Sequence, residues 1–230
     1  MNLSILYTAN IRGDLTLLPR LYTFIRSLQA DIRRFEPEDE AEVMLCAVQP
    51  KPLQTLLLDL GDSCADDVWH CAATGGRSTL IGLDAMGYHA ANVTGILLPE
   101  SRDKLAANVM SMGLVDSEHP WQLNNLYMTA LSGQEIGDSY TQHSALSTQP
   151  LHISLTPAIT TRLALNTLHL ARVETGQVGT AYIGGMDSQP NLLADAVFDL
   201  PADTPPDPTI SGTVDFVTNE ARFFSRKRDE

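Results

Sequence analysis

The chain opens with an apolar segment, residues 3–7, that runs directly into the polar loop 8–13. Residues 15–29 then place apolar side chains at helical spacing, and residues 55–60 form a second short apolar run that ends at a glycine. This order predicts a strand, an amphipathic helix and a second strand, which is the start of a βαβ unit. We expect the loop 8–13 at the carboxyl edge of the sheet, where α/β proteins commonly place functional side chains.

The rest of the first half continues the α/β pattern, and the second half changes to β. The predicted elements are helices at 78–86 and 101–112, a strand at 90–94, strands at 151–155, 165–173, 178–183 and 194–200, and a final helix at 214–228. Residues 115–150 are polar and predict a long excursion or flap. The late strands predict an antiparallel sheet after the parallel one, and we expect a single domain over residues 1–230.

Composition limits the setting and the partners. Of the 230 residues 43% are hydrophobic, which is enough for one full core. The formal charge of -13 argues against nucleic acid as a partner. The apolar runs are too short to span a bilayer and the first residues do not resemble a signal peptide, so we expect a soluble, cytoplasmic protein. Three cysteines, an odd and sparse set, favour reduced thiols.

Four segments of the chain carry a family resemblance. They are residues 3–13, 17–28, 55–62 with Asp59-Leu60-Gly61-Asp62, and 74–94 with Asp84-Ala85-Met86-Gly87. In this order they resemble the calcineurin-like metallophosphoesterases, most closely the amino-terminal catalytic domain of the 5'-nucleotidase branch. The resemblance implies an α/β fold, a four-layer α-β-β-α sandwich of two mixed sheets, with two divalent metals near the strand ends.

The metal-binding motifs of that family are degraded in this chain. Asn10 and Arg12 stand where the first motif has Asp and His, and Arg carries only donors, so it cannot ligate a cation. The second motif keeps Asp59 and its bridging carboxylate as Asp62. In the third motif, Gly95 and Ile96 occupy the positions of the amide ligand and the catalytic His, and a one-residue shift restores neither. The final pair of His residues, one residue apart, has no counterpart. We therefore expect no metal at these positions.

The surviving carboxylate has two interpretations. Arg12 would pair with Asp62 and fill the vacated metal position as a salt bridge. Alternatively, Asp62 is an ordinary capping residue after a strand.

A second signature competes with the first. His70-Cys71, five further residues and Arg77-Ser78 match the pattern of cysteine-dependent phosphatases, in which a thiolate attacks phosphorus and the Arg binds the phosphate oxygens. Thr74 replaces the usual glycine, however, and the nearby acidic residues Asp62, Asp66 and Asp67 would raise the thiol pKa. Cys71 and Arg77 therefore stand as the alternative catalytic pair.

Together these features predict a degenerate metallophosphoesterase-like protein without hydrolase activity, which acts as a binding or structural subunit and needs no cofactor. Its partner would be another protein or a second copy of the chain. The alternatives are a phosphoesterase with a minimal divalent-metal site around Asp62, or the cysteine phosphatase. A role in binding a phosphate or nucleotide through Arg12, Arg77 and the loop amides lies between them.

Overall fold

A computed structural model describes residues 2–34, 52–97, 99–108, 110–130, 151–185 and 189–228. The first sheet has the strand order β11(Asn191–Asp199), β10(Gln177–Gly184), β1(Asn2–Thr8), β2(Pro52–Asp59), β3(Ala90–Asn92) and β4(Gly113–Val115). Strands β1 to β4 are parallel, whereas β10 is antiparallel to both β1 and β11. The sheet is therefore mixed.

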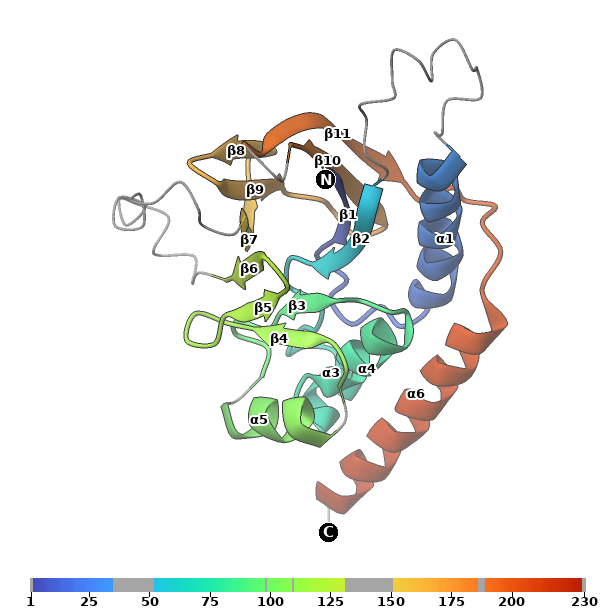
Figure 1. The fold of residues 1–230 in the computed structure, drawn as a ribbon. Helices are drawn as coiled ribbons and strands as arrows, with labels where there is room; N and C mark the ends of the chain where they lie inside the picture. Colours follow the sequence, from blue (N-terminus) through green and yellow to red (C-terminus); the bar gives the residue numbers. More distant parts are fainter. Residues whose placement is uncertain are drawn as a thin grey trace.

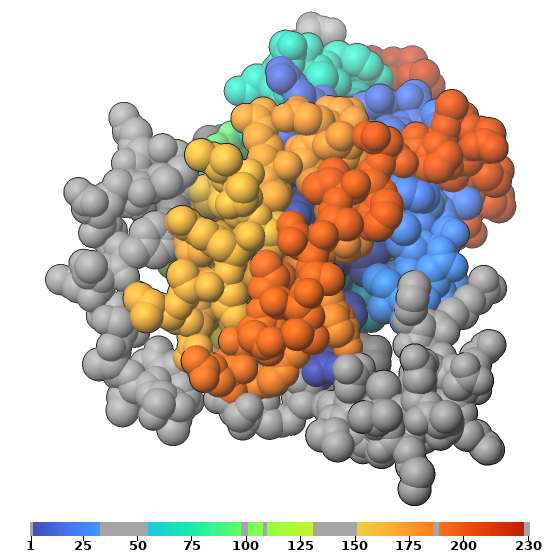
Figure 2. Space-filling view, turned by 90° about the horizontal axis from the view of Figure 1, so that it is seen from above, coloured from blue at the N-terminus to red at the C-terminus, as the bar shows by residue number. Residues whose placement is uncertain are grey.

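The second sheet is also mixed. Its order is β5(Trp121–Leu123), β6(Leu126–Thr129), β7(Leu151–Ala158), β9(Thr167–Ala171) and β8(Arg162–Ala164). Strand β7 is parallel to β6 and β9, and the outer strands β5 and β8 are antiparallel to their neighbours. Strands β8 and β11 are in contact, and the space-filling view shows the orange segment that contains β10 and β11 beside the yellow and golden segment that contains β7 to β9 (Figure 2).

Side-chain alternation along β1 explains how the layers form. Leu3, Ile5 and Tyr7 are buried in the core between the two sheets, whereas Leu6 is buried in a second core under the helices. Successive side chains of a strand point to opposite faces, so a strand buried on both sides is largely apolar. The run at residues 3–7, apolar except for the buried Ser4, is therefore the mark of a central strand.

The helices are α1(Leu18–Arg34), α3(Trp69–Thr74), α4(Arg77–Ala85), α5(Pro99–Asn108) and α6(Pro208–Arg228). They gather on the outer face of the first sheet, and α6 crosses the outside of α1, α3 and α4 (Figure 1). No helix in the described ranges covers the outer face of the second sheet. None of the described helices is both long and apolar enough to span a bilayer. The predicted α/β class with two mixed sheets is confirmed.

One prediction about the second half was wrong. The late strands do not build a separate antiparallel sheet, because β10 and β11 join β1 in the first sheet and β7 and β9 are parallel. Local patterns indicate which strands turn back on their neighbours, but they do not say which sheet receives the hairpin. The polar segment 115–150 contains the strands β5 and β6. Its remainder from residue 131 lies outside the described residues.

Candidate functional site

The loops after β1 and β2 lie side by side at the carboxyl edge of the first sheet. The amide of Asn10 donates to the carbonyl of Gly61 at 3.0 Å, and the amide of Arg12 donates to the carbonyl of Asp62 at 2.8 Å. A third bond of 2.9 Å joins the amide of Gly13 to Ser63. These bonds extend the β1–β2 pairing beyond the strands, so the first two predicted motifs meet, as the βαβ pattern required.

The backbone of these loops has an unusual conformation. Asn10, Arg12 and Asp62 have φ values of 56°, 53° and 54°, in the left-handed region. Non-glycine residues adopt this conformation at a cost on the order of 1 kcal/mol or more, and such residues cluster at functional sites. The loop geometry thus suits a site that presents side chains, although Arg12 has no lone pair for a cation and Asn10 offers only a neutral carbonyl oxygen in place of a carboxylate.

The Asn10 side chain is committed to the protein interior. It is only 8% exposed, and its Nδ2 donates to the carbonyl of Val173 at 2.7 Å. The backbone carbonyl of Asn10 also accepts a hydrogen bond from the hydroxyl of Thr175. Asn10 therefore joins the loop after β1 to the segment between β9 and β10, and it does not line the cavity described below.

The Asp59 side chain is also held in the protein interior. Its carboxyl group is fully buried, accepts the amide of Gly61 at 3.2 Å and accepts the hydroxyl of Thr8 at 3.4 Å. The Thr8 hydroxyl and the Tyr88 hydroxyl are 2.8 Å apart. Burial raises the pKa of Asp59 well above its ordinary value, and it raises the pKa of Tyr88 as well. This group is a structural polar cluster beneath the loops.

The remaining predicted positions converge on one cavity of about 320 Å³. Arg12 comes from the loop after β1, Asp62 from the loop after β2, and Gly95 and Ile96 from the loop after β3. An adjacent cavity of about 350 Å³ shares Gly95 and Ile96 among its lining residues. The topology therefore assembles Arg12, Asp62, Gly95 and Ile96, and it separates Asn10 and Asp59 from them.

The expected salt bridge between Arg12 and Asp62 does not form. Both side chains are exposed, and within the described ranges neither takes part in an ion pair. The strained loop backbone presents both groups toward water, where an isolated pair contributes little.

The donor set of the cavity does not fit the two divalent metals that the sequence resemblance implies. Asp62 and Asp66 supply carboxylates, but Arg12 adds a permanent positive charge and no lone pair. No group of three or more His, Cys, Asp or Glu residues suited to a metal occurs in the described part of the chain. A two-metal site needs several anionic or imidazole ligands at one point, which these residues do not supply.

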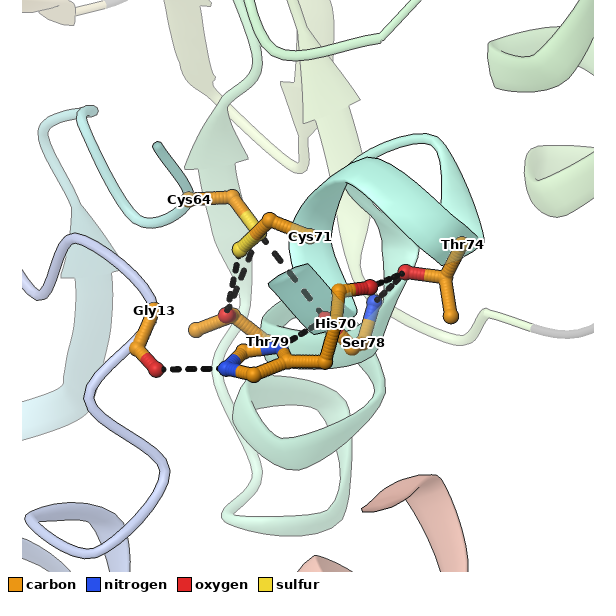
Figure 3. Close-up of a disulfide and its surroundings, with 7 residues drawn as sticks. All are labelled: Gly13, Cys64, His70, Cys71, Thr74, Ser78 and Thr79. Atoms are coloured by element: carbon orange, nitrogen blue, oxygen red, sulfur yellow. Dashed lines mark hydrogen bonds between the residues drawn. A yellow bond between two sulfur atoms is a disulfide. The ribbon is translucent and has the colours of Figure 1, made fainter. Parts of the chain in front are cut away.

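Cys64 and Cys71 form a disulfide with a Cα–Cα distance of 5.8 Å, so the expectation of reduced thiols was wrong for this pair (Figure 3). Cys64 lies in the loop after β2, and Cys71 lies within α3 and is 3% exposed. The bridge passes close to Gly13, where an added Cβ would approach the Cys71 sulfur to 2.8 Å. The sequence spacing did not reveal this pair, because the two cysteines meet only when the loop after β2 folds back against α3.

His70 joins the loop after β1 to α4, next to the disulfide. Its Nε2 is 2.8 Å from the Gly13 carbonyl and its Nδ1 is 2.8 Å from the Ser78 hydroxyl (Figure 3). Because a carbonyl only accepts, Nε2 carries the proton, and Nδ1 of the neutral ring accepts from Ser78. Burial lowers the pKa of His70, which favours this neutral form. His70 is a structural residue of the loop.

The cysteine-phosphatase site is not assembled. Cys71 has no free thiol, and it lies inside a helix instead of at the start of a phosphate-binding loop. Arg77 pairs with Glu220 of α6 at 2.7 Å, and its guanidinium lies 4.7 Å from the centroid of the Phe224 ring. The Arg of this signature thus holds α6 in place, and it lines neither cavity.

Sequence reasoning missed Asn92, which ends β3. Its Nδ2 donates to the carbonyls of Leu60 and Leu155 at 3.1 and 3.3 Å, and its Oδ1 accepts the amide of Thr94 at 3.0 Å. Asn92 therefore joins β3 and the loop after β2 to β7 of the second sheet. An asparagine within the predicted strand at residues 90–94 was the available signal.

Comparisons with solved structures show the fold. The calcineurin-like phosphoesterase YfkN from Bacillus subtilis aligns with a TM-score of 0.51 at 10% identity, over 98% of this chain and 99% of that one. The NAD nucleotidase NadN from Haemophilus influenzae aligns with a TM-score of 0.57 at 8% identity, over 96% of this chain and 60% of NadN. No family model and no curated protein sequence matches the chain. The chain therefore has a calcineurin-like phosphoesterase fold.

Proposed function

We propose that this chain is a metallophosphoesterase-like domain that does not hydrolyse phosphate esters and acts as a structural or binding subunit. The observation that carries the proposal is the position of Arg12 in the cavity. Its guanidinium projects from the loop that would deliver the first metal ligands. The side-chain amide of Asn10, in the same loop, donates a hydrogen bond to the carbonyl of Val173. A cation at that edge of the sheet would be repelled by Arg12, and among the described lining residues the carboxylates come from Asp62 and Asp66.

The same charges weaken the phosphate-binding alternative. This alternative requires both Arg12 and Arg77. Arg12 lines the cavity, whereas Arg77 does not line it and is paired with Glu220. Asp62 and Asp66 would repel a phosphate dianion at close range. A role through contacts with protein is therefore favoured over capture of a small phosphorylated ligand.

Metal analysis combined with a hydrolysis assay tests the proposal. The purified chain is expected to contain no stoichiometric Mn, Fe, Zn or Ni, to keep its melting temperature in chelator, and to leave bis-p-nitrophenyl phosphate intact when Mn²⁺ is added. Asp62→Asn should change none of these results, and Asp67→Asn, outside both cavities, serves as the matched control.

The opposite pattern supports the minimal-metal alternative. Two tightly bound divalent ions per chain, lost together with phosphodiesterase activity in Asp62→Asn but retained in Asp67→Asn, would refute the proposal.

A further inference from the structure

The outer face of α6 carries two large exposed aromatic side chains. Phe216 is 60% exposed and Phe223 is 63% exposed. Seven residues separate them, which is two helical turns, so both lie on the same side of the helix. The opposite side of α6 is firmly packed, with Ile210, Val217 and Ala221 buried at 1% exposure or less. The two aromatic side chains are therefore exposed although the helix itself is packed firmly against the rest of the molecule.

The charges around these aromatics are arranged in two halves. Asp215 lies beside Phe216 in the first half, whereas Arg222 and Arg226 flank Phe223 in the second half. All three charged side chains are exposed, and none of them belongs to an ion pair within the described ranges. Arg222 donates an exposed hydrogen bond of 3.2 Å to the side chain of Asn219. An acidic first half and a basic second half are complementary to themselves when two such helices run antiparallel.

We propose that this face is an interface between two copies of the chain, paired antiparallel through α6. Phe216 of each copy packs against Phe223 of the other, and Asp215 faces Arg222 of the second copy. The two-fold axis passes beside Asn219, midway between the two aromatics. Such an interface is isologous, the commonest arrangement in homo-oligomers. Aromatic burial drives the pairing, and the opposite charges set its direction and offset the repulsion between two acidic chains.

The helix is held in a fixed position for this contact. The Arg77–Glu220 ion pair and the Arg77–Phe224 contact attach α6 to the start of α4. The Phe224 ring also contacts the Phe223 ring edge-on, with centroids 5.7 Å apart, so this attachment lies next to the exposed aromatics and fixes their position. In Figure 1 the helix forms the outermost element on its side of the molecule. The interface shares no residue with the cavity, so it goes beyond the proposed function. A monomeric chain would leave the metal and hydrolysis results unchanged.

Sedimentation equilibrium tests the pairing. The wild-type chain is expected to be a dimer at micromolar concentrations, and Phe216→Ser with Phe223→Ser should weaken the dimer on the order of tenfold or more. Val197→Ser with Phe198→Ser is the matched control, because these residues of β11 are 45% and 41% exposed and should leave the dimer intact. A monomeric wild type, or a dimer that the two Phe changes leave intact, would overturn the proposal.

Charge reversal tests the antiparallel direction. Asp215→Arg alone should weaken the dimer, because it places like charges opposite each other. Adding Arg222→Asp should restore the affinity, since each changed position then again faces a side chain of opposite charge on the second copy. If the double variant is no tighter than Asp215→Arg, the proposed register is wrong.

Cross-linking tests the two-fold axis directly. In a Cys46→Ser background, Asn219→Cys should form an intermolecular disulfide on mild oxidation because the two copies of this position meet at the axis. Gly212→Cys on the same exposed face is the control, since its two copies would lie roughly 20 Å apart along the helices. Equal cross-linking at both positions, or at neither, would exclude the axis beside Asn219.

Discussion

Replacing Asn10 by Asp separates a structural role of this position from a metal-binding role. Asp is nearly the same size and also tolerates the φ of 56° found here, so the change acts on the side chain alone. The hydrogen bond from the Asn10 side-chain amide to the Val173 carbonyl is lost. A carboxylate, which has no donor, takes the place of the amide at a position that is 8% exposed. A buried carbonyl without its donor costs about 1–3 kcal/mol, and desolvation of the carboxylate adds to this.

We therefore expect Asn10→Asp to lose about 2–4 kcal/mol in urea unfolding at pH 7, with a melting temperature lower by roughly 5–12 °C. Asn124→Asp is the control, because Asn124 is exposed and has a similar φ of 52°, and it should stay within about 0.5 kcal/mol of wild type. If Asn10→Asp is as stable as wild type, or gains stability from Mn²⁺, the position is a ligand site and the structural reasoning is wrong.

Two further perturbations test the surroundings of the site. Because burial raises the folded-state pKa of Asp59, the free energy of unfolding should fall as pH rises from about 4 toward that raised value. Asp59→Asn should flatten this dependence in urea titrations at several pH values, and an unchanged slope would show that Asp59 is not its source. Replacing Cys64 and Cys71 together by Ala should lower stability by about 2.5 kcal/mol on the loop-closure estimate for a bridge across 7 residues. Dithiothreitol should destabilise the wild type but not this variant, and equal sensitivity would argue against the bridge.

Much of the first half of the fold was predictable from the sequence. The apolar runs at residues 3–7 and 55–60 predicted β1 and β2, and the helical stripe between them predicted α1, although α1 begins at Leu18 and continues to Arg34. These signals are local, because a strand buried on both faces is largely apolar and a helix on a sheet must be amphipathic. The same order of segments led to the resemblance that the structural comparisons support at the level of fold.

The direction of side chains was decided by tertiary structure. The sequence could name Asn10, Arg12, Asp59 and Asp62 as neighbours, since they follow adjacent parallel strands. It could not show that Asn10 bonds to Val173, 163 positions away, or that Asp59 is buried beneath the loops. Such contacts depend on how the β9–β10 segment packs against the first loop, and no local pattern encodes that.

The partners of Cys71 and Arg77 were decided in the same way. The spacing of these residues matched a phosphatase signature, but the fold joins Cys71 to Cys64 and Arg77 to Glu220. A motif specifies residue types at intervals along the chain, whereas chemistry depends on where the side chains point after folding. The sequence therefore determined the central strands and the main helices. The packing of distant segments determined that Arg12 and Asp62 face a common cavity while Asn10, Asp59 and Arg77 hold the fold together.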